Sequence, residues 1–184
     1  MAEIPPVCEF GWKARSFTLP GTEGIEYSLD DVRGSDGLLV MFICNHCPYV
    51  LAVLDRIVRD AKDLQKLGVG VVAISSNDVE TYPEDSFDNM KKLSDNFQFS
   101  FPYLYDESQE VAKLYQAACT PDFFGFNNKD ELQYRGRLDA SRKEAGPKDL
   151  RRDLFEALQE ISKTGAGPKN QIASMGCSIK WKVV

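Results

Sequence analysis

Residues 38–48 read LLVMFICNHCP, a run of six apolar residues that leads directly into a Cys-x-x-Cys motif. A continuous apolar run of this length is typical of a central strand that is covered on both faces. Pro48 suits the first position of a helix, and apolar residues then recur at helical spacing up to Gly68. The stretch therefore predicts a buried strand, the close pair Cys44 and Cys47, and a helix that begins at the second cysteine.

The following residues extend this unit into a sheet. Residues 69–74 (VGVVAI) repeat the buried-strand pattern, so strand, helix and strand have the length of a right-handed βαβ crossover with parallel strands. Residues 103–105 predict a further short strand. Residues 122–126 and 132–138 flank the turn sequence NNKD and predict an antiparallel hairpin. We expect an α/β fold with a central mixed sheet and helices on both faces.

The remaining segments predict shorter elements. Asp106, with Gln109 three residues on, resembles a capping box for a helix. A helix is also expected over residues 86–96, and Gly146-Pro147 is expected to open a last helix that includes Leu150. The chain ends are assigned to a β-hairpin extension (1–37) and an irregular tail (165–184).

Length and charge limit the function classes. The chain has 184 residues, which predicts one domain over 1–184, and its net charge is −6. This charge removes the general attraction to nucleic acid or anionic membranes, so neither is expected as a partner. The longest apolar run is far shorter than the roughly 20 residues that span a bilayer. The N-terminal residues lack the basic start and apolar stretch of a secretory signal, which favours a cytoplasmic location.

Cysteine spacing points to redox chemistry. The five cysteines are an odd number, unlike a fully paired secreted framework. Cys44 and Cys47 at a strand-to-helix junction can close and release a small disulfide, and the helix N-terminus favours a thiolate. A charged His46 between them would make that disulfide more oxidising. The alternative, a zinc site, needs two more ligands, but His46 is the only histidine and the other cysteines are scattered. No metal and no cofactor are therefore expected.

Several motifs, in order along the chain, carry a family resemblance. They are FICNHCPYV (42–50), SND (76–78), YPEDS (82–86), FPYLYD (101–106), ACTPD (118–122), YRGRLD (134–139) and GCSIKWK (176–182). From about Phe17 to the C-terminus the chain resembles a thioredoxin-like family that is grouped with the alkyl hydroperoxide reductase/thiol-specific antioxidant proteins. The resemblance implies the thioredoxin fold, with a cis-proline at Thr120-Pro121 packed against the active disulfide. Leu51-Ala52 departs from the Lys-His that the family suggests at this position.

The resemblance leaves two enzyme functions open. In thioredoxin-like oxidoreductases the first cysteine, here Cys44, is the exposed nucleophile and the second, Cys47, resolves the mixed disulfide. We expect this activity in cytoplasmic redox homeostasis, with a protein or small disulfide as substrate and a thioredoxin- or glutathione-type reductant as partner. Asn45 and Thr120-Pro121 are expected to shape the contact surface.

The alternative is a peroxiredoxin-like thiol peroxidase that reduces hydrogen peroxide or alkyl hydroperoxides with Cys47 as the attacking thiolate. Cys47-Pro48 fits that pattern, but Cys44 stands where peroxiredoxins have threonine. Arg135 or Arg137 would have to supply the guanidinium that lowers the thiolate pKa.

Other residues have a less specific signal. Cys119 lies beside the expected cis-proline and Cys177 in the tail, so both are candidates for an additional redox role, although a lone cysteine is commonly a small buried hydrophobe. The acidic loop 78–88 is interpreted as solvated surface. A non-catalytic binding module on the same fold is a third alternative, since fold alone does not define function.

Overall fold

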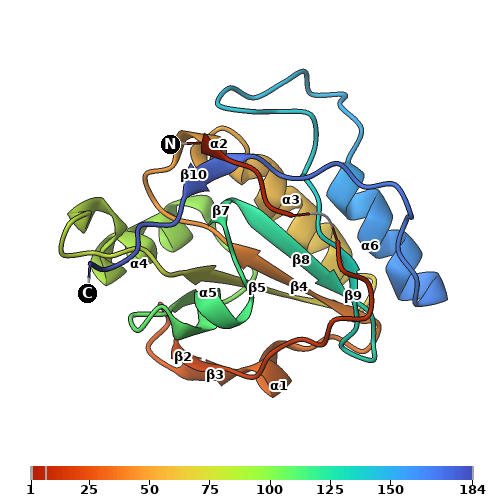
Figure 1. The fold of residues 1–184 in the computed structure, drawn as a ribbon, viewed down its shortest axis with the longest axis horizontal. Helices are drawn as coiled ribbons and strands as arrows, with labels where there is room; N and C mark the ends of the chain where they lie inside the picture. Colours follow the sequence, from red (N-terminus) through yellow and green to blue (C-terminus); the bar gives the residue numbers. More distant parts are fainter. Residues whose placement is uncertain (1, 7, 184) are drawn as a thin grey trace.

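The computed structural model describes residues 2–6 and 8–183 of the chain. A five-stranded sheet lies at its centre in the order β6-β5-β4-β8-β9 (Figure 1). The central strand β4 (Gly37–Phe42) runs parallel to β5 (Val69–Ser75), which is parallel to β6 (Tyr103–Tyr105). On its other side β4 pairs antiparallel with β8 (Asp122–Phe126), which pairs with β9 (Leu132–Tyr134). The predicted mixed sheet is confirmed.

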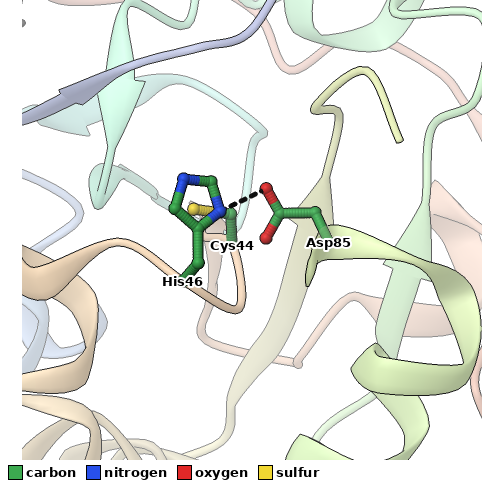
Figure 2. Close-up of side chains that lie close together, drawn as sticks. All are labelled: Cys44, His46 and Asp85. Carbon is green, nitrogen blue, oxygen red and sulfur yellow. Dashed lines mark ion pairs between the residues drawn. The ribbon is translucent and has the colours of Figure 1, made fainter. Parts of the chain in front are cut away.

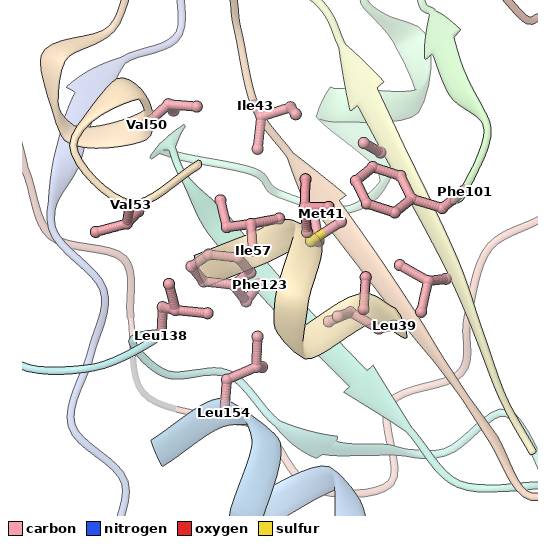
Figure 3. Close-up of a cluster of buried hydrophobic side chains, with 14 of the residues drawn as sticks. Leu39, Met41, Ile43, Val50, Val53, Ile57, Phe101, Phe123, Leu138 and Leu154 are labelled. Carbon is pink, nitrogen blue, oxygen red and sulfur yellow. The ribbon is translucent and has the colours of Figure 1, made fainter. Parts of the chain in front are cut away.

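Side chains of β4 alternate between two hydrophobic clusters, because successive residues of a strand point to opposite faces. Leu39 and Met41 of β4 belong to one cluster, together with Ile43, which directly follows the strand. That cluster also includes residues of α3 (Leu54–Gln65) and α6 (Asp153–Thr164), such as Ile57 and Leu154 (Figure 3). Met90 of α4 (Phe87–Phe97) belongs to it as well.

The opposite face of the sheet is covered by different elements. Leu38, Val40 and Phe42 pack there with α1 (Leu29–Val32), α5 (Glu110–Leu114) and the hairpin of β2 (Thr18–Pro20) and β3 (Glu26–Ser28). Helices therefore cover both faces, as expected for a thioredoxin-like fold (Figure 1). The predicted N-terminal hairpin is present, but it forms a separate two-stranded sheet and is followed directly by α1.

The helix after the cysteines is not continuous. It consists of α2 (Pro48–Leu51) and α3, because Val53 leaves the helical conformation at φ −125° and ψ 9°. The apolar side chains of Val50, Val53 and Leu54 keep their helical spacing across this break and are all buried. Periodicity therefore could not reveal the interruption.

The predicted capping box at Asp106 and Gln109 is wrong. The Asp106 carboxylate instead accepts hydrogen bonds from the Ser76 hydroxyl and the Ala112 backbone N–H, both at 2.9 Å. Gln109 has a left-handed backbone with φ 64°, and its side-chain amide donates to the carbonyl of Ser76 at 2.6 Å. Because both side chains tie the loop to the end of β5, α5 begins only at Glu110.

The last helix also starts later than predicted. The buried guanidinium of Arg56, on α3, donates to Asp139, to Ser141 and to the carbonyl oxygens of Gly146 and Pro147. These bonds hold the segment as a loop, and α6 begins at Asp153, which leaves Leu150 outside the helix.

The second hairpin strand is shorter than predicted. β9 ends at Tyr134, and the chain then leaves the sheet. The Arg137 backbone N–H donates to the carbonyl of Ile172 instead of to a neighbouring strand of the sheet.

The C-terminal segment is more ordered than the predicted irregular tail. Within it, β10 (Gly176–Ser178) pairs antiparallel with β7 (Cys119–Thr120) and with β1 (Ala2–Glu3). A Cβ at Gly176 would lie 2.1 Å from the Thr120 carbonyl oxygen, so only glycine permits this close approach. In the described part of the chain, no helix is both long and apolar enough to cross a membrane.

Candidate active site

The two neighbouring cysteines lie just beyond the C-terminal end of β4, where open α/β sheets present their sites. Cys47 is the N-cap residue of α2 and Pro48 is its first residue, as predicted. The Cys44 sulfur lies 3.3 Å from the Thr120 hydroxyl oxygen, and the Cys47 sulfur lies 3.1 Å from the Thr120 carbonyl oxygen. Cys44 is 1% exposed and Cys47 0%. The expectation of an exposed Cys44 is therefore wrong for this conformation.

The Thr120–Pro121 peptide bond is cis, as the family resemblance implies. Thr120 follows Cys119 in β7, and Pro121 leads into β8, so the turn between these strands places Thr120 against both thiols. Thr120 and Pro121 are buried, which contradicts the expectation that they form an exposed contact surface. In this conformation they back the dithiol from inside the protein.

The Cys44 and Cys47 thiols influence each other's ionisation. Hydrogen bonding from the Cys44 thiol to the Cys47 thiolate lowers the pKa of Cys47 to about 5, with smaller contributions from Cys177 and Thr120. The same bond, burial and the Asp85 carboxylate raise the pKa of Cys44 well above its ordinary value. A second negative charge beside the first is costly in a buried site. The pair therefore holds one proton near neutral pH.

Cys177 is brought to the same site by β10. It lies opposite Thr120 in the antiparallel pair with β7 and packs against the hydrophobic cluster that contains Cys44 and Cys47. Cys177 is half-buried, and burial and the neighbouring Cys47 raise its pKa to about 11. Cys44, Cys47 and Cys177 thus all lie around Thr120.

Cys119 lies nearby but in a different environment. It is fully buried, and its thiol donates to the Pro121 carbonyl at 3.5 Å. Burial and the Asp122 carboxylate raise the pKa of Cys119. These are the properties of an inert core thiol.

The two candidate arginines bind carboxylates elsewhere. Arg135 is buried, donates to Asp122 at 2.9 Å and lies over the ring of Phe124. Arg137 pairs with Asp153 at 2.7 Å. Each guanidinium is thus engaged by a carboxylate.

Asp85 is the site residue that the sequence interpretation missed. It lies in the acidic segment that was interpreted as solvated surface, at the end of the short 3-10 helix η1 (Pro83–Asp85), yet it is fully buried. Its carboxylate accepts from the Asn45 backbone N–H at 2.8 Å and from the Asn77 side chain at 2.7 Å. It also lies 2.7 Å from Nδ1 of His46 (Figure 2). No spacing relates Asp85 to the cysteines, so only the fold brings them together.

Asn45 connects the dithiol loop to its surroundings. Its side chain donates to the Glu84 carbonyl at 3.1 Å and accepts from the Tyr103 hydroxyl at 3.0 Å. Because both groups of its amide are bonded inward, Asn45 positions the loop between η1 and β6. The expected role in a contact surface is not supported by these bonds.

Comparisons with known proteins identify a family and solved structures that this chain resembles. The model of the AhpC/TSA family matches residues 10–136. An uncharacterized conserved protein from Geobacillus kaustophilus is 45% identical with a TM-score of 0.94, over 100% of this chain and 98% of that one. A hypothetical protein from Sinorhizobium meliloti 1021 is 36% identical with a TM-score of 0.93, over 100% of both chains.

A more distant structure shares only the fold. The thioredoxin domain of a thiol-disulfide oxidoreductase from Bacteroides vulgatus is 15% identical with a TM-score of 0.58, over 72% of this chain and 89% of that one. No curated protein sequence matches. The family match spans more than half of the chain and includes both cysteines of the dithiol, and it supports an oxidoreductase that works through thiols. The chain belongs to the AhpC/TSA family.

Proposed function

We propose that this protein is a thiol-disulfide oxidoreductase whose working dithiol is Cys44 and Cys47. One observation carries the proposal: two thiols lie at the end of a central strand, both within hydrogen-bond distance of Thr120 in the cis Thr120–Pro121 turn. The lowered pKa of Cys47 gives the pair the thiolate that exchange chemistry needs. Burial of both sulfurs means that a substrate reaches them after a local opening of the loop around His46.

The proposed reaction has two exchange steps. Cys44 attacks a substrate disulfide RSSR′ and forms a mixed disulfide with RS, while its proton passes to the Cys47 thiolate and R′S⁻ leaves. The Cys47 thiol then gives this proton to R′S⁻. The Cys47 thiolate attacks Cys44 in the mixed disulfide, which forms the Cys44–Cys47 disulfide and releases RS⁻. A thioredoxin- or glutathione-type dithiol or thiol returns the two electrons in a cytoplasmic, reducing compartment.

The experiment that tests these roles is trapping with Cys47→Ser. This variant should accumulate a mixed disulfide between Cys44 and a model disulfide peptide, because no resolving thiol attacks it. Cys119→Ser is the matched control, since Cys119 is a buried thiol outside the exchange steps, and it should turn over like the parent. Full multiple-turnover exchange by Cys47→Ser would show that the assigned roles are wrong.

Cys177 is proposed as a second exchange partner of Cys47, because it lies opposite Thr120, whose carbonyl oxygen is 3.1 Å from the Cys47 sulfur. If Cys44 is replaced by serine and the chain is oxidised with diamide, Cys47 and Cys177 should form a disulfide with Cys119 left free. Mass-spectrometric mapping that finds Cys47 unpaired, or paired with Cys119, would remove Cys177 from the proposed chemistry.

A thiol peroxidase is the second candidate, and the lowered pKa of Cys47 beside Pro48 is the observation that favours it. Its thiolate would attack a hydroperoxide ROOH, giving Cys47 sulfenic acid and RO⁻, which takes up a proton. A second thiol would then form a disulfide and release water. Rapid quenching after addition of hydrogen peroxide, with mass spectrometry of each cysteine, tests this: sulfenic acid on Cys47 within one turnover supports the peroxidase. The engagement of both arginines elsewhere favours disulfide exchange instead.

A further inference from the structure

We infer that the reduced protein binds one Zn²⁺ ion, or a divalent cation of similar preference, through the Cys44 sulfur, Nδ1 of His46 and a carboxylate oxygen of Asp85. The three donor atoms all lie within 4.8 Å of one another. They come from two separate elements, the dithiol loop and η1 (Figure 2). The inference goes beyond the proposed exchange activity, although both use Cys44.

The His46 geometry is the second observation that supports a cation. Nδ1 of His46 is shielded from solvent and lies only 2.7 Å from the Asp85 carboxylate. Despite that distance, it is outside hydrogen-bond geometry and has no other hydrogen-bond partner among the residues described. A cation shared between Nδ1 and the carboxylate would give both groups a partner.

The donor set suits zinc. Thiolate, imidazole and carboxylate are the three common protein ligands of Zn²⁺, with bonds of about 2.0–2.3 Å. Around one tetrahedral ion, such bonds place the donors about 3–4 Å apart. The His46 and Asp85 donors, now 2.7 Å apart, would have to separate, and any pair more than about 4 Å apart within the 4.8 Å limit would have to approach. Three protein ligands leave a fourth position for water or another ligand.

Surrounding groups fix the ligands and favour positive charge. Asn45 and Asn77 donate to the two oxygens of Asp85, which orients the carboxylate as outer-shell partners do in metal sites. The imidazole of His46 stacks on Tyr82, with ring centroids 5.9 Å apart and an interplanar angle of 2°. Asp85 is fully buried and Cys44 nearly so, and burying two negative ligands without a cation is costly. A divalent cation would neutralise both negative ligands together.

Redox state should control this site. When a substrate disulfide RSSR′ oxidises the pair, the Cys44–Cys47 disulfide forms, and RS⁻, R′SH and the cation are released. The disulfide sulfur is no longer a thiolate ligand, so His46 and Asp85 alone remain. Binding is therefore expected for the reduced form only, and a bound ion would shield Cys44 from substrate.

The test is an anaerobic Co²⁺ titration of the reduced, chelator-treated full chain, followed by displacement with Zn²⁺. We expect one equivalent of Co²⁺ to give a thiolate-to-cobalt charge-transfer band that is absent in the oxidised protein and in Cys44→Ser. Asp85→Asn and His46→Ala should each weaken binding by more than about tenfold. Asp88→Asn is the matched control, since Asp88 is an exposed carboxylate in the same acidic segment, and it should bind like the parent.

Cys47→Ser separates this inference from the proposed function, because it keeps the three donors and removes the disulfide. It should still give the charge-transfer band with one equivalent of Co²⁺. Absence of the charge-transfer band in the reduced parent, or parental affinity in both Asp85→Asn and His46→Ala, would overturn the inference whatever the exchange activity. Circular dichroism confirms folding of each variant. Metal binding without disulfide exchange would instead refute only the proposed function.

Discussion

Cys47 combines complete burial with a lowered pKa, although burial alone raises the pKa of a thiol. The hydrogen bond from Cys44 outweighs desolvation, and Cys177 adds a second, weaker contact. The reduced dithiol is therefore stabilised as a thiolate that is held by two neighbouring thiols. This arrangement determines how the site responds to pH.

The first prediction concerns this ionisation. In the metal-free reduced protein, thiolate absorbance should rise through a midpoint of about pH 5 rather than near the ordinary value of 9.0. Cys44→Ala should move the midpoint toward 9.0 and Cys177→Ala should move it less, in the order of their contributions. Since the folded pKa lies below the unfolded one, this ionisation stabilises the reduced fold fully above about pH 9 and progressively less as pH falls toward 5. An unchanged midpoint in Cys44→Ala would contradict the shared hydrogen bond.

A second prediction distinguishes the effects of His46 and Asp85 on the reduction potential of the dithiol. Asp85→Asn removes a carboxylate that opposes ionisation of Cys44, so it should raise the reduction potential. His46→Asn removes a group that can carry positive charge and should lower it. Each shift is expected to be up to about 30 mV, a tenfold change in the equilibrium constant. Equilibration with glutathione in the presence of a chelator measures both, and shifts of the same sign would contradict this account.

At the residue scale, the sequence revealed the chemistry but not its surroundings. The spacing of Cys44 and Cys47 and their place after a strand identified the dithiol. Asp85 was not identifiable because its burial depends on η1 folding over the dithiol loop, and a carboxylate in an acidic segment gives no signal of that. In the sequence Cys177 is only a lone cysteine. Its place beside the dithiol depends on the pairing of β10 with β7, which joins segments far apart in the chain.

At the element scale, strands were easier to predict than helix ends. Buried strands have a strong local signal, and β4, β5 and β8 lie where the apolar runs predict them. Helix ends depended on distant groups, as at α6, where a guanidinium on α3 holds the preceding loop. The sequence around Arg56 does not indicate which distant loop it will bind, and the sequence of the loop does not indicate Arg56.

The third prediction tests this loop anchor. Arg56→Leu should destabilise the protein by about 3 kcal/mol, because it leaves the buried Asp139 without its cation. It should also expose the loop 139–152 to proteolysis. Arg59→Leu is the control, since Arg59 lies on the same helix and pairs only with the adjacent Asp60. Urea unfolding and limited proteolysis measure both effects, and equal behaviour of the two variants would show that Arg56 does not anchor the loop.

At the scale of the whole molecule, one sheet carries two hydrophobic clusters and presents the dithiol at the end of its central strand. Alternation along β4 determines which helices cover each face, so the layered fold was predictable from apolar patterns. Motif resemblance added the cis Thr120–Pro121 bond that local patterns do not reveal. The three-stranded sheet of β1, β10 and β7 was missed, because its strands are short and lack an apolar run.

The central claim, a working Cys44–Cys47 dithiol, is tested most directly by equilibrating the reduced chain with glutathione redox buffers and mapping the disulfide by mass spectrometry. We predict a Cys44–Cys47 disulfide with a midpoint between about −120 and −270 mV, the range of thiol-disulfide oxidoreductases. A midpoint below about −300 mV, typical of a structural disulfide, or oxidation that leaves Cys44 and Cys47 unpaired with each other, would contradict it.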